Sequence, residues 1–180
     1  MIITISGLPG SGKSTAAKTV AKRLGFRFYS IGDLRGEIAR KHGITIDELN
    51  RIGEKEDWTD READNYLKEL GKKEDNFVAD SRLGFHFIPE SKKIFLKVDP
   101  RVGAERIFRA EKRPDEREYT SVEDVLEENR SRVASDEKRY RKWYGVNCLD
   151  ESNYDIVIDT TNLTREQTVE KILEFVKKSG

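Results

Sequence analysis

Short apolar runs alternate along the chain with longer segments in which apolar residues recur every three or four positions. The short runs are rich in β-branched and aromatic residues and predict buried strands of a parallel sheet. They occupy residues 2–5, 26–29, 77–79, 94–98 and 156–158. The longer segments predict helices, because this spacing places apolar side chains on one helical face.

The predicted helices separate each strand from the next. The first begins near Lys13, and the last follows Thr164, a residue suited to cap a helix. Residues 44–73 predict irregular helices, and two charged helices are expected at about 100–113 and 121–144. This alternation indicates an α/β fold, a five-stranded parallel sheet with helices on both faces.

Length and charge narrow the class of protein. The chain has 180 residues, enough for one domain with a substantial core and short for two. Lys+Arg and Asp+Glu number 34 each, so no net charge favours nucleic acid or a membrane surface as a partner. The single cysteine, Cys148, excludes an internal disulfide, and no apolar stretch has membrane-spanning length. We therefore expect a cytoplasmic protein of one domain.

A glycine-rich stretch stands between the first predicted strand and the first predicted helix. It consists of Gly7, Leu8, Pro9, Gly10, Ser11, Gly12, Lys13, Ser14 and Thr15. A glycine, four residues and then Gly-Lys-Ser is the phosphate-loop pattern, in which backbone N–H groups and a helix N-terminus converge on phosphate oxygens. We expect the whole stretch to bind ATP, Lys13 to act as a catalytic residue on the β- and γ-phosphates, and Ser14 to ligate Mg²⁺.

The loop alone does not name the reaction, because many functions share it. A GTPase is disfavoured: Asp33 and Gly36 have the Asp-x-x-Gly spacing but follow the second strand, and no Asn-Lys-x-Asp sequence occurs. An ATP-binding or ATPase regulatory module stays open, and so does a shikimate-type kinase. The basic run at 130–142 fits such a module, although a solvated charged helix is commoner.

Arginines recur where open parallel sheets place their ligands. Arg35 follows the second predicted strand, Arg82 follows the third, and Arg106 and Arg109 lie on the helix after the fourth. Transfer of a phosphoryl group between two nucleotides brings several anionic groups together, and arginines neutralise them. The pattern favours a kinase with a phosphorylated acceptor over a hydrolase.

The predicted helix at 121–144 carries charges of alternating sign. Arg132, Asp136 and Arg139 stand at i, i+4 and i+7 and share one side of the helix. Arginine binds phosphate oxygens and aspartate accepts from a sugar hydroxyl, whereas the alternative is a salt bridge on the surface. The apolar stripe that we expect to face the core is Val122, Leu126, Val133, Tyr140 and Tyr144.

Together these features resemble the cytidylate kinases, most closely the compact archaeal type. The resemblance spans nearly the whole chain and rests on residues 7–15, 80–82 and 154–161 and on the Arg132–Asp136–Arg139 spacing. It implies a P-loop NTPase three-layer fold with a helical acceptor-binding segment at about 36–73 and a lid at about 109–120. The implied reaction transfers the γ-phosphoryl group of MgATP to CMP or dCMP. Adenylate kinase or another small-molecule P-loop kinase is the alternative.

The resemblance also implies roles on the acceptor side. Ser30 and Arg35 resemble a serine and an arginine that hold the base and the phosphate of the acceptor, and the helical triad resembles one that holds its phosphate and ribose. The expected acceptor-binding residues are Ser30, Arg35, Arg82, Arg132, Asp136 and Arg139. One position departs from the bacterial pattern, because Leu83 stands where an aspartate helps to read cytosine.

On the donor side, Arg106 resembles a lid arginine that reaches the donor phosphates, and we expect it to act with Arg109 as a catalytic residue. Asp80 ends a predicted strand, where a carboxylate holds Mg²⁺ through water or caps a helix. Small kinases of this kind are usually monomers, so the resemblance implies a monomer that binds small-molecule nucleotides.

Overall fold

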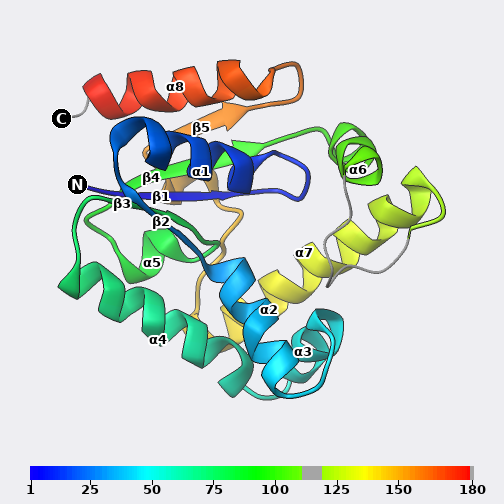
Figure 1. Cartoon of the computed structure of the whole chain (residues 1–180). Coiled ribbons are helices and arrows are strands. Elements are labelled where there is room, and N and C mark those ends of the chain that lie inside the picture. Colours follow the sequence, from blue (N-terminus) through cyan, green and yellow to red (C-terminus); the bar gives the residue numbers. More distant parts are fainter. Residues whose placement is uncertain (111–118, 179–180) are drawn as a thin grey trace.

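The computed structural model describes residues 1–110 and 119–178 (Figure 1). Its strands are β1 (Ile2–Gly7), β2 (Arg27–Ser30), β3 (Phe77–Asp80), β4 (Lys92–Lys97) and β5 (Ile156–Asp159). All neighbouring strands are parallel, in the order β2-β3-β1-β4-β5. The predicted five-stranded parallel sheet is confirmed, and the predicted strand ends differ from the observed ones by at most two residues.

The helices expected near Lys13, at 44–73, at about 100–113 and 121–144 and after Thr164 are present, whereas the short helices at 84–87 and 151–153 were not predicted. The helices are α1 (Lys13–Leu24), α2 (Ile31–Lys41), α3 (Ile46–Gly53), α4 (Trp58–Lys73), α5 (Gly84–Phe87), α6 (Pro100–Arg109), α7 (Val122–Tyr144) and α8 (Arg165–Lys178), with the short 3-10 helix η1 (Glu151–Asn153). The irregular segment at 44–73 divides into α3 and α4. Residues 111–118, most of the expected lid at about 109–120, lie outside the described part of the chain.

Polar side chains and glycine set several helix ends. The Ser30 hydroxyl accepts from the Asp33 amide and caps α2, and Thr164 likewise accepts from the Gln167 amide at the start of α8, as predicted. Gly145 ends α7 at φ +69°, in the left-handed conformation that glycine adopts without strain.

The sheet lies between two layers of helices (Figure 1). One face packs against α1 and α8, and the opposite face against α4 and α5. The first core contains Ile3, Ile5, Val20, Val78, Ile94, Leu96 and Ile172, and the second contains Ile38, Leu49, Leu67, Phe77 and Ile88. The helices α2, α3, α6 and α7 lie beyond the carboxyl ends of the strands, where such folds bind ligands.

The prediction for the buried side of α7 is wrong. Of the expected apolar stripe only Tyr140 is buried, and the other four residues are partly exposed. The buried residues of the helix are Val125, Asn129, Asp136, Arg139 and Tyr140. Charged residues of α7 face inward because other elements supply ion-pair partners there. These ion pairs offset the free-energy cost of removing the charges from water.

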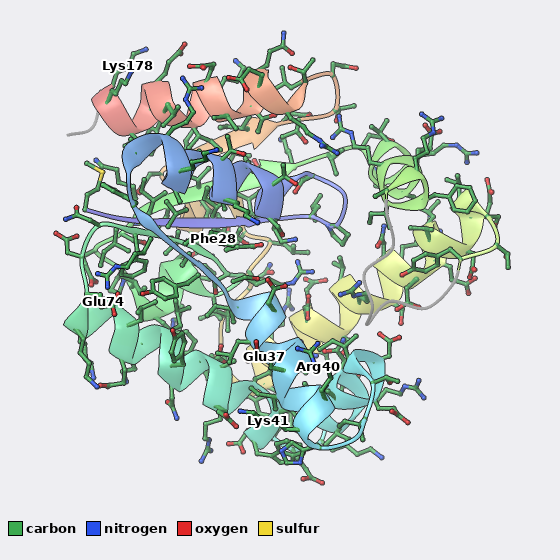
Figure 2. All side chains as sticks on the ribbon, viewed as in Figure 1. Phe28, Glu37, Arg40, Lys41, Glu74 and Lys178 are labelled. Atoms are coloured by element: carbon green, nitrogen blue, oxygen red, sulfur yellow. The ribbon has the colours of Figure 1, made fainter. Side chains whose placement is uncertain are left out.

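Charged side chains cover the outside of the molecule, in keeping with the 38% of charged residues in the sequence. In Figure 2, Glu37, Arg40 and Lys41 on α2 and Lys178 at the end of α8 are exposed, whereas Phe28 on β2 packs against the first core. Among the helices of the described residues, none is long and apolar enough to cross a membrane.

Candidate active site

The glycine-rich loop joins β1 to α1 at the carboxyl edge of the sheet (Figure 1). The Leu8 amide donates to the carbonyl of Leu96 on β4 at 3.0 Å. Gly10 and Gly12 adopt φ of +75° and +82°, a region that favours glycine. Because a side chain at position 10 would collide with the backbone of Gly103, the loop packs directly on α6.

The first turn of α1 is open to an anion. Gly12 occupies the N-cap and has no side chain to cap the helix, and the turn contains no acidic residue. Such a terminus presents N–H groups and a partial positive charge. Lys13 and Ser14 belong to the same turn, so a cation and a hydroxyl lie beside these amides.

A cavity of about 740 Å³ adjoins this turn. The loop, α6 and the start of α8 bound it. Its hydroxyl-bearing and basic lining residues include Ser11, Lys13, Ser14, Thr15, Arg82, Arg106, Arg109, Arg132 and Arg165. The volume lies within the range of about 300–1,000 Å³ typical of small-molecule sites. Its basic lining fits a polyphosphate.

The residues near the loop also fit Mg²⁺ bound together with phosphates. Ser14 lies in the first turn of α1, and Asp80 ends β3, where it pairs with Ile5 of β1. Throughout residues 1–110 and 119–178, no group of three or more His, Cys, Asp or Glu side chains could hold a metal. One hydroxyl and one carboxylate match Mg²⁺, which keeps several waters and takes further oxygens from substrate phosphates.

Arg106 connects α6 to the segment before α8. Its Nη2 donates to the Thr160 carbonyl at 2.8 Å, and the Thr160 hydroxyl donates to the Ser11 carbonyl at 3.2 Å. These bonds hold one wall of the cavity against the phosphate loop. Arg109 is 79% exposed and lies 3.7 Å from the Glu105 carboxylate. Both arginines line the cavity, and their contact with donor phosphates stays a prediction.

Beside the cavity, Arg35, Asp60, Arg139, Asp136 and Arg82 form a continuous series of ion pairs, called here the ion-pair chain. Asp60 Oδ1 lies 3.1 Å from Arg35 Nη2, and its Oδ2 lies 3.1 Å from Arg139 Nε. The two oxygens of Asp136 lie 2.5 Å from Arg139 Nη2 and 2.5 Å from Arg82 Nε. The ion-pair chain connects α2, α4 and α7 to the segment after β3.

The ion-pair chain is buried in the middle and accessible at its ends. The side chains of Arg139 and Asp60 are 0% and 2% exposed, whereas those of Arg35 and Arg82 are 12% and 19% exposed. Burial by itself raises the pKa of Asp136, but the guanidinium groups of Arg82 and Arg139 outweigh it and hold that pKa below its ordinary value. Asp136 is therefore ionised at neutral pH.

Arg35 retains capacity to bind a ligand. Its Nε and Nη2 are buried and donate no hydrogen bond among the described residues, because the contact with Asp60 has ion-pair distance without hydrogen-bond alignment. A buried donor without an acceptor costs free energy. A bound anion that accepts from these donors would remove that cost. The ion-pair chain also has a net charge of one, because it contains three arginines and two carboxylates.

Two further predicted site residues lie outside the ion-pair chain. Ser30 lies at the start of α2 with its oxygen engaged as the helix cap, and Arg132 lines the cavity one helical turn before Asp136. The departure at Leu83 has a structural reason. Leu83 is 2% exposed and packs with Tyr140 and Cys148, so this position belongs to the core.

Sequence reasoning missed the residues that α3 and α4 contribute. Asn50 Oδ1 accepts from Arg139 Nη1 at 2.8 Å, and Asp60 binds two arginines as described. One turn further on α4, Asp64 accepts from the Tyr144 hydroxyl at 2.5 Å. A signal was present, because Asp60 and Asp64 share the helical face of the apolar Ala63 and Leu67, and charge on a buried face requires partners.

Comparisons with known proteins point to one family. The sequence model of the cytidylate kinase-like family matches residues 2–162. The cytidylate kinase of Archaeoglobus fulgidus is 35% identical over 178 residues, covering 98% of this chain and 95% of that protein. That of Methanocella arvoryzae is 37% identical over 161 residues, covering 89% and 88%. An S-adenosylmethionine-dependent nucleotide dehydratase of Lacinutrix mariniflava is 35% identical over 179 residues, and the chain covers 36% of its length.

Solved structures share the fold at lower identity. Shikimate kinase from Bacteroides thetaiotaomicron has a TM-score of 0.68 at 18% identity, covering 98% of each chain. Shikimate kinase from Acinetobacter baumannii has a TM-score of 0.61 at 22% identity, covering 99% of this chain and 93% of that one. These likenesses confirm the P-loop kinase fold, and the match of family and relatives over most of the chain goes further: the chain belongs to the cytidylate kinase-like family and is a phosphotransferase.

Proposed function

We propose that the protein is a nucleoside monophosphate kinase that transfers the γ-phosphoryl group of MgATP to CMP or dCMP, giving ADP and CDP or dCDP. The observation that carries this proposal is the ion-pair chain, which ends beside the phosphate loop, where Arg82 Nη1 donates to the Gly7 carbonyl at 3.2 Å. A reaction between two nucleotides needs cations between the donor and acceptor phosphates, and this arrangement supplies them.

In this proposal residues 7–15 bind the phosphates of ATP. Lys13 binds the β- and γ-phosphates, while Arg106 and Arg109 border the same cavity and neutralise charge at the transferred group. Mg²⁺, held by Ser14 and through water by Asp80, would add charge neutralisation on the donor phosphates.

The sequence predicts that Arg35, Arg82 and Arg139 bind the acceptor phosphate. Because the Arg139 side chain is 0% exposed, we assign this role to Arg35, Arg82 and Arg132. Ser30 contacts the base. The remaining acceptor residues are Asp136, whose oxygens keep lone pairs for the ribose, and Arg139, which lies behind them.

The chemical step requires no general base, because the acceptor phosphate is anionic at neutral pH. One of its oxygens forms a bond to the γ-phosphorus as the bond from that phosphorus to the bridging oxygen breaks, and ADP leaves with the electron pair. Catalysis consists of in-line positioning and charge neutralisation. Exclusion of water from the site would suppress hydrolysis of ATP.

The preference for cytosine rests on the relatives, since the proteins from Archaeoglobus fulgidus and Methanocella arvoryzae are named cytidylate kinases. The chain's own residues support a nucleotide acceptor through the arginines, while Leu83 lies in the core. We expect a cytoplasmic monomer of one domain.

An ADP-release assay with MgATP tests the proposal. CMP, dCMP, UMP, AMP, GMP and shikimate serve as acceptors, with a reaction lacking any acceptor as control. We expect CMP and dCMP to react far faster than the rest. A higher rate on AMP would keep the reaction class and replace the base preference, and a higher rate on shikimate would indicate a non-nucleotide kinase. Equal ADP release with and without acceptors would indicate an ATPase module and refute the proposal.

A further inference from the structure

Asp60 occupies a central place between the acceptor-side helices. It lies on α4, is buried, and faces arginines from two other helices, Arg35 of α2 and Arg139 of α7. Each carboxylate oxygen serves one arginine. A single buried carboxylate therefore fixes the distance between two cations that come from separate parts of the chain.

The surroundings of Asp60 leave it little freedom to move. Gly53, the last residue of α3, packs so closely that a side chain there would lie 2.5 Å from Thr59 Oγ1 and 2.7 Å from Arg139 Cδ. Asn50 of the same helix holds Arg139 from another side. With α3 against it, the Asp60–Arg139 pair has a defined position, which an arginine in water would lack.

Arg35 depends most on this arrangement. Its buried Nε and Nη2 donate no hydrogen bond among the described residues, and the attraction of Asp60, 3.1 Å from Nη2, holds the guanidinium in place through charge. Through Arg139 and Asp136 the same carboxylate is connected to Arg82, which reaches the Gly7 carbonyl.

We propose that Asp60 is a positioning residue that holds Arg35 in the orientation that binds the acceptor phosphate and connects it, through the ion-pair chain, to the phosphate loop. This inference rests on the proposed kinase function and adds α4 to the site. Asp60 itself touches no substrate, because both of its oxygens face arginines and it is buried. Removing its charge leaves Arg35 and Arg139 as neighbouring cations without the carboxylate between them.

Two simpler roles of Asp60 predict different kinetics for Asp60→Asn. If Asp60 only lowered the positive charge of the site, Asp60→Asn would strengthen binding of an anionic acceptor. If Asp60 only stabilised the fold, Asp60→Asn would lower the melting temperature without a selective effect on the acceptor. Glu69 provides a control on the same helix, because its carboxylate pairs with Lys72 and Lys73 on the surface, away from the ion-pair chain.

The test compares Asp60→Asn, Arg35→Ala, the double variant and Glu69→Gln. KM for the best acceptor of the panel, KM for ATP, kcat and melting temperature are measured for each. We expect Asp60→Asn to raise the acceptor KM and lower kcat by about tenfold or more each, while the ATP KM stays within about twofold. Because Asp60 acts through Arg35, the double variant should lose far less than the product of the two single losses. Glu69→Gln should leave all three kinetic constants close to wild type.

An acceptor KM within twofold of wild type in Asp60→Asn, a lowered acceptor KM, or losses that multiply in the double variant would overturn the inference. If Asp60→Asn does not fold, Asp60→Glu keeps the charge but shifts it by one methylene. A folded Asp60→Glu with an unchanged acceptor KM would then refute positioning. A wild-type enzyme that phosphorylates none of the monophosphates would refute the proposed function and this inference with it. Failure of the variants alone refutes only the role of Asp60.

Discussion

The guanidinium of Arg82 bonds to the phosphate loop and to the acceptor-side helices at the same time. Its Nη1 donates to the Gly7 carbonyl at 3.2 Å, and its Nε lies 2.5 Å from Asp136 of α7. One side chain thus sets the position of the end of β1 relative to α7. In the proposed reaction it stands between the two substrates, so its geometry bears on both.

Arg82→Lys should lower kcat/KM for the acceptor by about a hundredfold. The three donors of an ammonium share one nitrogen, whereas the planar guanidinium reaches Asp136 with Nε and the Gly7 carbonyl with Nη1. Steady-state kinetics measures this loss. Arg27→Lys is the control, because Arg27 pairs with Glu74 on the surface at 2.7 Å. Equal kinetics of Arg82→Lys and wild type would show that charge alone suffices at position 82.

Lys13→Ala should lower kcat by about a thousandfold, because the variant loses a cation at the developing charge on the transferred phosphoryl group. The side chain lines the cavity, so the fold and the melting temperature should change little. The ADP-release assay and circular dichroism measure the two effects. Turnover close to wild type in a folded Lys13→Ala protein would contradict the phosphate-loop assignment.

Gly10→Ala should abolish ATP binding and lower stability more than a matched glycine substitution. Gly10 and Gly25 have φ of +75° and +68°, so alanine at either position pays the left-handed strain of about 1–2 kcal/mol. Only at position 10 does the new Cβ also collide with Gly103, whereas no atom lies within 4 Å at position 25. Thermal unfolding with and without ATP separates these effects. Similar behaviour of the two variants would show that the loop and α6 adjust freely.

The titration of Asp64 should make the free energy of unfolding depend on pH. Burial raises the pKa of Asp64 from 3.8 to about 7, and the nearby charge of Asp60 adds to the increase, against the hydrogen bond from Tyr144. A folded-state pKa above the unfolded value means that the folded protein binds the proton more tightly. The protonated Asp64 carboxyl contributes fully to the stability of the folded protein below about pH 4. This contribution is lost as pH rises to about 7. At about 1.4 kcal/mol per pKa unit, the loss is at most on the order of 4 kcal/mol.

Asp64→Asn keeps an acceptor for the Tyr144 hydroxyl and removes this titration. We therefore expect the variant to melt several degrees above wild type at pH 8 and close to wild type at pH 4. Denaturation scans across this range measure the difference between the two proteins, which cancels the titration of other groups. A constant difference at all pH values would contradict a raised pKa of Asp64.

Much of the fold follows from local sequence. The strand runs and the helical spacing report burial of neighbouring residues, and Thr164 and Ser30 mark helix starts through bonds to amides three residues away. The buried side of α7 does not follow from local sequence, because only Tyr140 of its expected apolar stripe is buried. Its apolar residues favour burial by themselves, but which side of a helix faces inward depends on what the other elements bring to it.

The acceptor side was partly visible in the sequence. The spacing of Arg132, Asp136 and Arg139 indicated a charged cluster, and the structure places Asp136 and Arg139 in the ion-pair chain. Asp60 and Asn50 were not identified: the position of Asp60 on the apolar face of α4 indicates burial, but it does not indicate which partners neutralise the charge. Their partners come from α7, far away in the sequence.

The sequence by itself determined the phosphate loop, the succession of strands and helices along the chain, and the likeness to a kinase family. Contiguous motifs and short-range periodicity encode all three. Only the tertiary structure decided which charges are buried and which partners neutralise them. A buried ion pair needs two groups within about 4 Å in a low-dielectric interior. Sequence spacing cannot measure that distance between helices, so the arrangement of Arg35, Asp60 and Arg139 emerges only when α2, α4 and α7 pack together.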